Sequence, residues 1–197
     1  MSTLSLTQMA ALFPKIPPLQ REIYYPPLCE AMDEFEIDTP KRMAAFLAQV
    51  GHESGGLVWM REIWGPTKAQ LKYEPPNAVA KRLGNTEKGD GKRFMGRGPI
   101  QLTGRANYEK YGKLLGVDLI NDPDAACGPS VAFRIAGCYW DQKHLNVLAD
   151  IDDFREITRR INGGYNGYDD RVRYWNRTRD ALEVPYPGGK VDAGANV

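Results

Sequence analysis

The chain has 197 residues, of which 42% are hydrophobic and 26% are charged, and its formal net charge at pH 7 is +1. This length suits one domain, or one domain with two lobes. The balanced charge excludes a strong overall field for nucleic acid or for an anionic membrane surface, so neither is an expected partner.

The first 18 residues lack the basic start and the long apolar run of a secretory signal. No stretch reaches the roughly 20 apolar residues of a membrane span. We therefore expect synthesis in the cytoplasm and no stable membrane insertion. The three cysteines, Cys29, Cys127 and Cys138, form no CxxC pair, which favours free buried thiols over a disulfide framework or a zinc site.

Apolar side chains at helical spacing begin near the N-terminus. They predict a first helix over 4–13, with Thr7 as its cap and a proline directly after it. A second helix is predicted over 28–35, where the preceding prolines, Pro26 and Pro27, open the segment.

The clearest helix signal covers 40–53, where Asp38 or Thr39 can cap the helix and a proline occupies the first turn. The apolar face of this segment is broad, so we expect a buried helix. Gly55 and Gly56 follow directly and are expected to end it.

The middle of the chain has weaker helical patterns. Short helices are predicted over 68–73 and 77–83, whereas the Gly-, Asn- and Lys-rich residues 84–98 predict an exposed loop or a short hairpin. Helical spacing then returns, and we expect further helices over 108–115, 124–140, 154–161 and 169–182.

These patterns predict a mainly α fold with a small β element between 84 and 103. We expect residues 1–185 to form one domain. The remaining residues, 186–197, are rich in Pro and Gly without a pattern, and we expect a flexible tail.

Glu53 stands where the buried helix over 40–53 ends. The helix dipole disfavours a negative charge at a helix C-terminus, and apolar neighbours disfavour it further. Both effects favour the neutral carboxylic acid, which is the form that a general acid needs.

Glu62 follows Glu53 after nine residues, which on one continuous helix would place it on the opposite face. The glycine break removes that constraint, so the two carboxyl groups can face each other. Two carboxyl groups in different environments are the minimum equipment for glycoside hydrolysis. Glu74, Glu87 and Asp90 are rival second carboxylates, which we expect to be solvated surface charge.

A second polar motif, GRGPIQLTGRANYEKYG, covers 96–112. Gln101 and Thr103 alternate about one leucine, so on an extended segment they would point the same way and could hold a sugar hydroxyl or a water. The motif lacks the GKS/T of a phosphate cradle. A third motif, INGGYNG, places Asn162 and Asn166 on either side of two glycines.

The motifs GHESGG, GRGPIQLTGRANY and INGGYNG, in this order, resemble glycoside hydrolase family 19. The resemblance extends from about residue 4 to residue 182 and is stronger to the phage-type endolysins of the family, which cut peptidoglycan, than to its chitinases. It implies a two-lobed, lysozyme-like α fold with a substrate groove. It also implies an inverting mechanism, in which the two carboxyl groups lie roughly 6.5–9.5 Å apart.

Residue by residue, the resemblance assigns the general acid to Glu53 and the water-activating base to Glu62. The family's substrate- and water-holding positions fall on Gln101, Thr103, Asn162 and Arg171. Thr103 stands where plant enzymes have serine. Asn166 stands where they have a glutamate, and this second difference argues mildly against a chitinase specialist.

The other candidate residues have simpler interpretations. His52 is expected to support Glu53 from beside it, because no HExxH motif points to zinc, and His144 is expected to be an ordinary surface residue. We expect neither a metal nor a cofactor. The aromatic residues that could stack on sugar are Trp59, Trp64, Tyr73 and Phe94, whereas Trp140 and Trp175 are expected in the core. The cations Lys92, Arg93, Arg97, Arg105 and Lys110 either meet an anionic polymer or form a solvated face.

The expected function is that of a monomeric endolysin that hydrolyses the β-1,4 bonds of bacterial peptidoglycan. Without a signal sequence, it would wait in the host cytoplasm until a separate membrane-permeabilising protein gives it access to the cell wall. A chitinase remains an alternative with the same chemistry. A non-catalytic glycan-binding protein on the same scaffold and a toxin delivered into rival bacteria remain further alternatives.

Overall fold

The computed structural model describes residues 4–186 and 189–190, and these residues form a mainly α fold. The α-helices in chain order are α1 (Leu6–Leu12), α2 (Pro18–Glu34), α3 (Pro40–Glu53), α4 (Ala78–Leu83), α5 (Asp90–Arg93), α6 (Arg105–Leu115), α7 (Pro129–Gln142), α8 (Leu145–Asp150), α9 (Phe154–Asn162) and α10 (Tyr168–Ala181). Short 3₁₀ helices cover η1 (Gln70–Tyr73) and η2 (Pro123–Cys127). None of the described helices combines the length and the apolar character that crossing a membrane requires.

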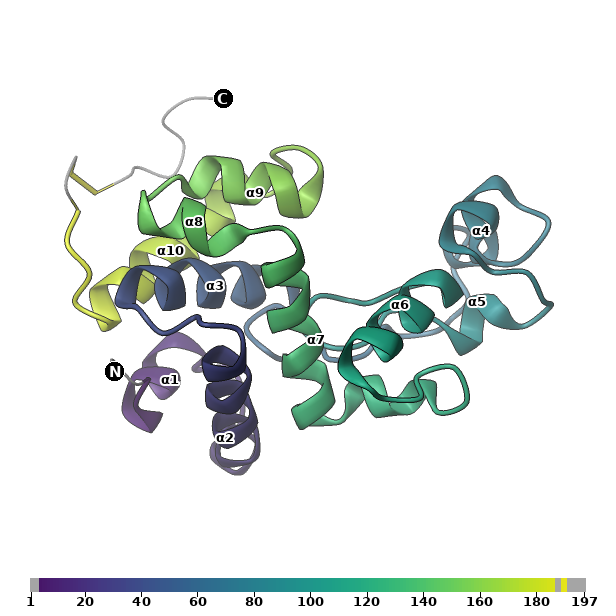
Figure 1. Cartoon of the computed structure of the whole chain (residues 1–197), viewed down its shortest axis with the longest axis horizontal. Helices are drawn as coiled ribbons and strands as arrows, with labels where there is room; N and C mark the ends of the chain where they lie inside the picture. The colour runs from purple at the N-terminus through teal and green to yellow at the C-terminus, as the bar shows by residue number, and fades with distance from the viewer. Residues whose placement is uncertain (1–3, 187–188, 191–197) are drawn as a thin grey trace.

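The helices gather into two lobes, as predicted. In Figure 1, α1 to α3 and α8 to α10 lie on one side, α4 to α6 lie on the other, and α7 runs between them. Each lobe has its own cluster of buried apolar side chains, and α7 contributes Phe133 and Trp140 to one and Ile135 and Cys138 to the other. The single helix α7 therefore joins the two cores.

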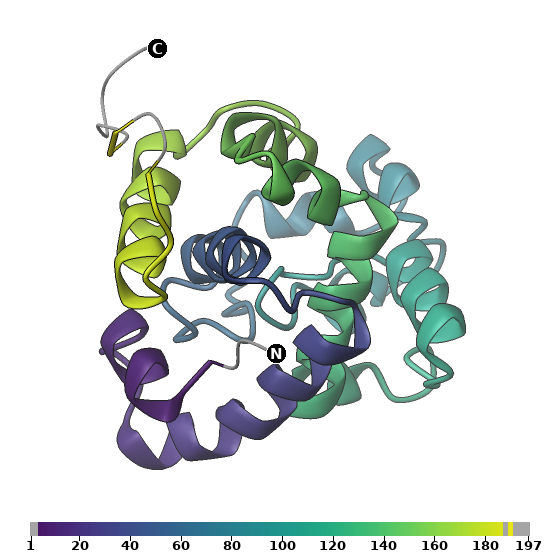
Figure 2. The same ribbon diagram turned by 60° about the vertical axis from the view of Figure 1, so that its left-hand side comes forward.

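Helix α3 is the centre of the larger lobe. Figure 2 shows α3 nearly end-on, with other helices around it. Thr39 caps it through a bond from the Arg42 amide to its hydroxyl oxygen, 3.2 Å long, and α10 packs along it. The predicted cap, bounds and burial of this helix are confirmed. Glu53 therefore stands at the end of a rigid, buried element.

The prediction for α2 was wrong, because the helix begins ten residues earlier than expected and continues through Pro26 and Pro27. Each proline removes one helical hydrogen bond. The carbonyls that lose their partners belong to Glu22 and Ile23, which are exposed, so water can replace the missing donors. The cap of α1 is Ser5 rather than Thr7, since Ser5 and Gln8 form a reciprocal capping box.

The segment 84–98 differs from the expected exposed loop. It contains α5, and residues 94–99 after α5 are buried. The β element of the described residues consists of two isolated bridges, in which Arg97 pairs with Arg61 and with Leu102. Helix α8 is a further element that the sequence patterns did not predict.

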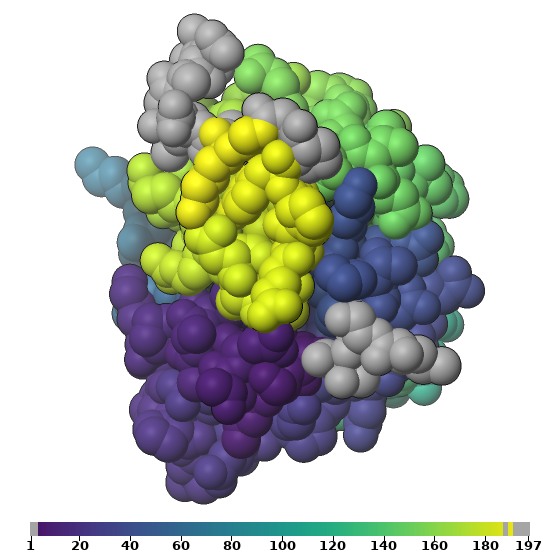
Figure 3. All heavy atoms as spheres, turned by 90° about the vertical axis from the view of Figure 1, so that its left-hand side faces the viewer, coloured from purple at the N-terminus to yellow at the C-terminus, as the bar shows by residue number. Residues whose placement is uncertain are grey.

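The chain after α10 lies against the larger lobe. Figure 3 shows the end of α10 and the residues after it beside the N-terminal helices, and the Gln8 side chain donates to the Ala181 carbonyl at 2.9 Å. Within the predicted tail, Tyr186 and Lys190 both bind Asp180. The rest of that tail, 187–188 and 191–197, lies outside the described residues.

Candidate active site

Glu53, the last residue of α3, is held by an arginine from α10. Nη2 of Arg171 donates to Oε1 of Glu53 at 2.5 Å, and Nη1 of the same guanidinium donates to Gln49, one turn earlier on α3. Arg171 is only 1% exposed, whereas the Glu53 side chain is 26% exposed. The ion pair fixes Oε1. The Glu53 carboxyl group is still partly exposed, so a substrate can reach it.

His52 lies beside Glu53 and is itself held by α10. Its Nδ1 is 2.7 Å from Oδ2 of Asp170. Burial alone would raise the pKa of Asp170, but the contacts with His52 and Arg173 outweigh burial and lower it. The His52 ring also packs on Gly167, where an added Cβ would lie 2.6 Å from its Cε1. These contacts fix the imidazole in place, as a supporting residue requires.

The chain reverses between the two glutamates. Gly55, Gly56 and Leu57 have positive φ angles, and the Ser54 hydroxyl accepts a 2.7 Å bond from the Leu57 amide. A Cβ on Gly55 would lie 2.6 Å from the Trp59 indole. The glycine therefore lets this tryptophan, which is 55% exposed, fold back over the turn.

Glu62 is held entirely by amide groups. Its Oε1 accepts from Gln70 Nε2 at 2.9 Å, and its Oε2 accepts from the Gly96 amide at 2.8 Å. The Glu62 amide in turn donates to the Gly96 carbonyl at 2.9 Å. Burial and, second, the negative charge of Glu62 raise the pKa of the neighbouring Tyr73. The carboxylate thus has fixed geometry with neutral donors at both oxygens.

Gln101 and Thr103 reach the same place as Glu62. A Cβ on Gly96 would lie 2.6 Å from Gln101 Oε1 and 3.3 Å from both Thr103 Oγ1 and Glu62 Oε2, so these three oxygens converge around a glycine. The expected extended segment was wrong, because Gln101 has a φ of +51° in a turn. Its Nε2 donates to the Trp59 and Gly98 carbonyls, and the Thr103 hydroxyl donates to the Gln101 carbonyl at 2.8 Å.

The INGGYNG motif forms the end of α9 and the following turn. Asn162 is exposed at this end, and its Oδ1 accepts from the Asn166 amide at 3.3 Å. Tyr139 of α7 donates to the carbonyl of the preceding residue, Ile161, at 3.1 Å. Burial, followed by the negative charge of Glu53, raises the pKa of Tyr139 to about 12. The motif therefore lies near Glu53, through Tyr139.

Several residues at the site carried no signal in the sequence. They are Gln49, Gln70, Tyr139 and Asp170. Gln49 is separated from Arg171 by 122 positions, so no local pattern could have paired them. Asp170 could have been suspected, because it directly precedes the candidate residue Arg171 in YDDRVRYW.

Two of the three rival carboxylates, Asp90 and Glu74, accept hydrogen bonds that hold the smaller lobe together. Asp90 is 2% exposed and binds Arg105 at 2.6 and 2.8 Å as well as two backbone amides, so the expected solvated charge was wrong here. Glu74 accepts from the Gly89 amide at 2.8 Å. Glu87 stays largely exposed, with a 3.3 Å contact to Arg105.

The aromatic and basic candidates divide into core and surface residues. Phe94 lies in the core of the smaller lobe, whereas Trp140 and Trp175 lie in the larger core as predicted. Trp64 lines a pocket of about 510 Å³ with Leu71 and Glu74, next to the segment that carries Glu62. Of the five cations between 92 and 110, Arg97 and Arg105 are bound internally, to Asp124 and Asp90 respectively.

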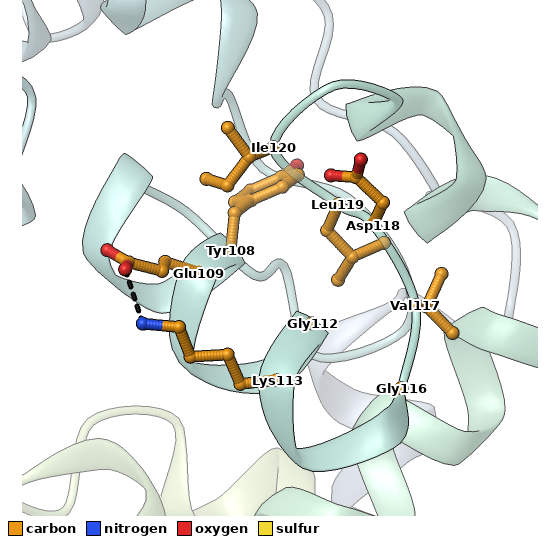
Figure 4. Close-up of a pocket in the computed structure, with 9 residues that line it drawn as sticks. All are labelled: Tyr108, Glu109, Gly112, Lys113, Gly116, Val117, Asp118, Leu119 and Ile120. Atoms are coloured by element: carbon orange, nitrogen blue, oxygen red, sulfur yellow. Dashed lines mark hydrogen bonds and ion pairs between the residues drawn. The ribbon is translucent and has the colours of Figure 1, made fainter.

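Another hollow lies away from the two glutamates. Figure 4 shows this pocket of about 300 Å³ beside α6 and the turn after it. Of the three charged residues that line it, Glu109 and Lys113 pair with each other at 2.6 Å, and the third is Asp118. Within the described ranges, no group of three or more His, Cys, Asp or Glu side chains is placed to hold a metal ion.

Comparison with known proteins identifies relatives over most of the chain. Residues 27–149 match the family model for class I chitinases. A glycosyl hydrolase family 19 domain-containing protein of Haemophilus influenzae is 37% identical over 157 residues, covering 68% of this chain and 76% of that protein. An endochitinase of Arabidopsis thaliana is 40% identical over 138 residues, covering 68% of this chain but only 44% of the endochitinase. The chain thus spans less than half the length of that plant relative.

Solved structures agree with this relationship. Chitinase C from Streptomyces griseus superposes with a TM-score of 0.72 at 25% identity, over 91% of this chain and 76% of that one. A bacterial family 19 chitinase superposes with the same TM-score at 27% identity, over 95% and 98%. The chain therefore belongs to glycoside hydrolase family 19, and it is a glycoside hydrolase of the chitinase-like, lysozyme-like fold.

Proposed function

We propose that this glycosidase hydrolyses the β-1,4 bonds of bacterial peptidoglycan by an inverting mechanism, with Glu53 as the acid and Glu62 as the base. The observation that carries the proposal is that the two carboxyl groups are held by different kinds of partner. One has an ion pair on a single oxygen, whereas the other has amide donors on both oxygens.

Glu53 suits the acid because its carboxyl group stays partly exposed. Arg171 orients the carboxyl group through Oε1, and Oε2 can present a proton to the glycosidic oxygen. Transfer of the proton lets the bond between the anomeric carbon and the leaving oxygen break.

Glu62 suits the base because its carboxylate is fixed and accepts only neutral donors. Oε2 lies near Thr103 Oγ1 and Gln101 Oε1 around Gly96, and we propose that a water is held among these oxygens. The water oxygen attacks the anomeric carbon from the side opposite to the leaving group and gives its proton to Glu62. Exchange with solvent then returns one proton to Glu53 and removes one from Glu62.

The substrate proposal has a competitor of the same chemistry. Chitin is favoured by the named relatives, since the Arabidopsis and Streptomyces proteins are an endochitinase and a chitinase. Peptidoglycan is favoured by the phage-type resemblance of the motifs and by Asn166, which stands where plant enzymes have a glutamate. On this proposal the enzyme acts as a monomer on the periplasmic wall, and a separate protein that permeabilises the membrane releases it.

The test is to incubate the protein with purified peptidoglycan and with chitin and to identify the new reducing ends by mass spectrometry. The proposal predicts new ends on N-acetylmuramic acid, and EDTA should not change their rate of appearance. New ends from chitin alone would make the enzyme a chitinase. Free amino groups without new reducing ends would contradict both assignments.

A further inference from the structure

Three cations from three helices gather beside Tyr139. Lys110 belongs to α6, Lys143 is the cap residue after α7, and Arg160 belongs to α9. Nη1 of Arg160 donates to the Lys143 carbonyl at 3.1 Å, and Nζ of Lys143 lies 5.0 Å from the centre of the Tyr139 ring. Elements of both lobes therefore contribute to one positive cluster.

Lys110 reaches the cluster through a second tyrosine. Its Nζ lies 5.3 Å from the centre of the Tyr111 ring, and the Tyr111 and Tyr139 rings are 6.4 Å apart. Tyr139 also connects the cluster to the catalytic residues, because its hydroxyl binds the carbonyl next to Asn162 and its phenol responds to the charge of Glu53.

The positive charge of this cluster is only partly compensated. Glu156 binds Arg160 at 3.0 Å, but it also binds Arg159. Among the described residues, Lys110 and Lys143 have no carboxylate within 4 Å. Asp141 is a further nearby acid, because its charge raises the pKa of the Cys138 thiol while the charge of Lys110 lowers it.

Keeping these cations together has an electrostatic cost. Burial first, and then repulsion from Lys110 and Arg160, lower the pKa of Lys143. A protein tolerates such repulsion at a site where a ligand supplies the missing charge. The ligand must then be an anion, and its position near Asn162 and Tyr139 makes it part of the bound glycan.

We infer that Lys110, Lys143 and Arg160 form a subsite for a carboxylate carried by the glycan, an inference that rests on the proposed cleavage of peptidoglycan. Chitin is neutral, whereas peptidoglycan carries carboxylates on the lactyl groups of its muramic acid or on the stem peptides attached to them. Arginine and lysine are the side chains that bind carboxylates, through charge-assisted hydrogen bonds. The subsite would therefore distinguish the two polymers.

The test measures binding in a Glu53→Gln background, so that ligands survive the measurement. Three soluble ligands of equal length are compared by calorimetry. They are a neutral N-acetylglucosamine oligomer, a peptidoglycan strand stripped of peptides, and a strand that retains its stem peptides. The second carries free lactyl carboxylates, and the third carries carboxylates only on its peptides, so the two anionic arms distinguish the sources.

Lys110→Gln and Lys143→Gln should each weaken binding of one anionic strand about 5-fold, while binding of the neutral oligomer stays within 2-fold. Lys113→Gln is the matched control, because Lys113 lies on α6 but pairs with Glu109, and it should change neither. A thermal melt of each variant checks folding.

The outcomes separate the subsite from the substrate proposal. A protein that binds neither anionic strand more tightly than the neutral oligomer has no such subsite, whichever polymer it cleaves. Equal loss for charged and neutral ligands in the lysine variants would also overturn the inference. A wild-type protein that prefers an anionic strand through these lysines but cleaves only chitin would keep the subsite and lose the proposed substrate.

Discussion

The two catalytic candidates are built in opposite ways. Glu53 ends a buried helix of the larger lobe and is fixed by Arg171, whose own position depends on α10, more than 100 positions along the chain. Glu62 lies outside the helices and is fixed by the Gly96 backbone and Gln70. Arg171 orients Glu53 through one oxygen and leaves the carboxyl group a quarter exposed, whereas amide donors orient Glu62 through both oxygens. The proposed difference in roles can be tested by replacing each glutamate separately.

The largest effect is expected from Glu53→Gln, which keeps the shape of the side chain and removes its transferable proton. An unactivated glycoside should be cut at least about 10²-fold more slowly. A substrate with a good leaving group needs less proton donation and should be partly spared. Steady-state kinetics on the two substrates measures this contrast, with a melting temperature within a few degrees of wild type as the control. Unchanged activity would remove Glu53 from the reaction.

Glu62→Gln should slow both substrates alike, by about 10²-fold, because it removes water activation and not proton donation. Azide should restore this variant more than Glu53→Gln, since a small anion can attack without a base. The product should then be a glycosyl azide of inverted configuration, identified by NMR. If Glu62→Gln retains activity near wild type, another carboxylate is the base, and Glu74 would be the next candidate.

A methyl group should disturb the Glu62 side of the comparison without changing a catalytic side chain. Gly96→Ala places a Cβ 2.6 Å from Gln101 Oε1 and 3.3 Å from Glu62 Oε2 and Thr103 Oγ1. We expect activity to fall about 10-fold, because a small displacement of positioning groups is costly. Gly164→Ala is the control in the Glu53 lobe, since its Cβ meets only Asn162 Oδ1, at 3.9 Å. Equal activity of the two variants would contradict convergence at Gly96.

Asp90→Asn should lower the stability of the fold rather than the rate of catalysis, because Asp90 is a buried residue of the smaller lobe that binds Arg105. Leaving Arg105 without its buried partner should cost about 3 kcal/mol, which corresponds to a melting temperature about 9 °C lower for a chain of this size. Glu87→Gln, at a largely exposed position, should change it little.

The stability contributed by Asp90 should depend on pH in a defined direction. Although burial opposes it, the hydrogen bonds from Arg105 and from two backbone amides lower the pKa of this carboxyl group. A lowered folded-state pKa gives stability that is present above the unfolded value, about 3.9, and is lost as pH falls through the folded value. The melting temperatures of wild type and Asp90→Asn should therefore converge on acidification from pH 7 to pH 3. A constant difference would contradict this account.

The same contrast between regions explains how much could be predicted from the sequence. Helix α3 was predicted with its cap because Thr39, a first-turn proline and a broad apolar face are local signals. The path of α2 through Pro26 and Pro27 was not, because exposure of the freed carbonyls depends on how the folded helix packs. Asp90 was taken as surface charge for the same reason, since its burial depends on Arg105, 15 positions away.

The candidate site shows the same division between residues with local sequence signals and residues that only tertiary contacts reveal. The short motifs predicted roles for Glu53, Glu62, Gln101, Thr103 and Asn162. The structure brings Gln101 and Thr103 to Glu62. Tyr139, whose pKa the charge of Glu53 raises, donates to the carbonyl of Ile161, the residue before Asn162. Gln70, which binds Glu62, and Gln49, which binds Arg171, were missed because a single glutamine carries no pattern. Their importance follows only from tertiary contacts.

In the proposed mechanism, Glu62 activates a water that attacks the anomeric carbon directly, without a covalent intermediate. The most direct measurement follows the anomeric configuration of the first product by proton NMR during hydrolysis of a soluble β-1,4-linked substrate, before mutarotation. Inversion predicts that the α-anomer appears first and then equilibrates. Initial release of the β-anomer would mean retention of configuration, and it would contradict the roles assigned here to Glu53 and Glu62.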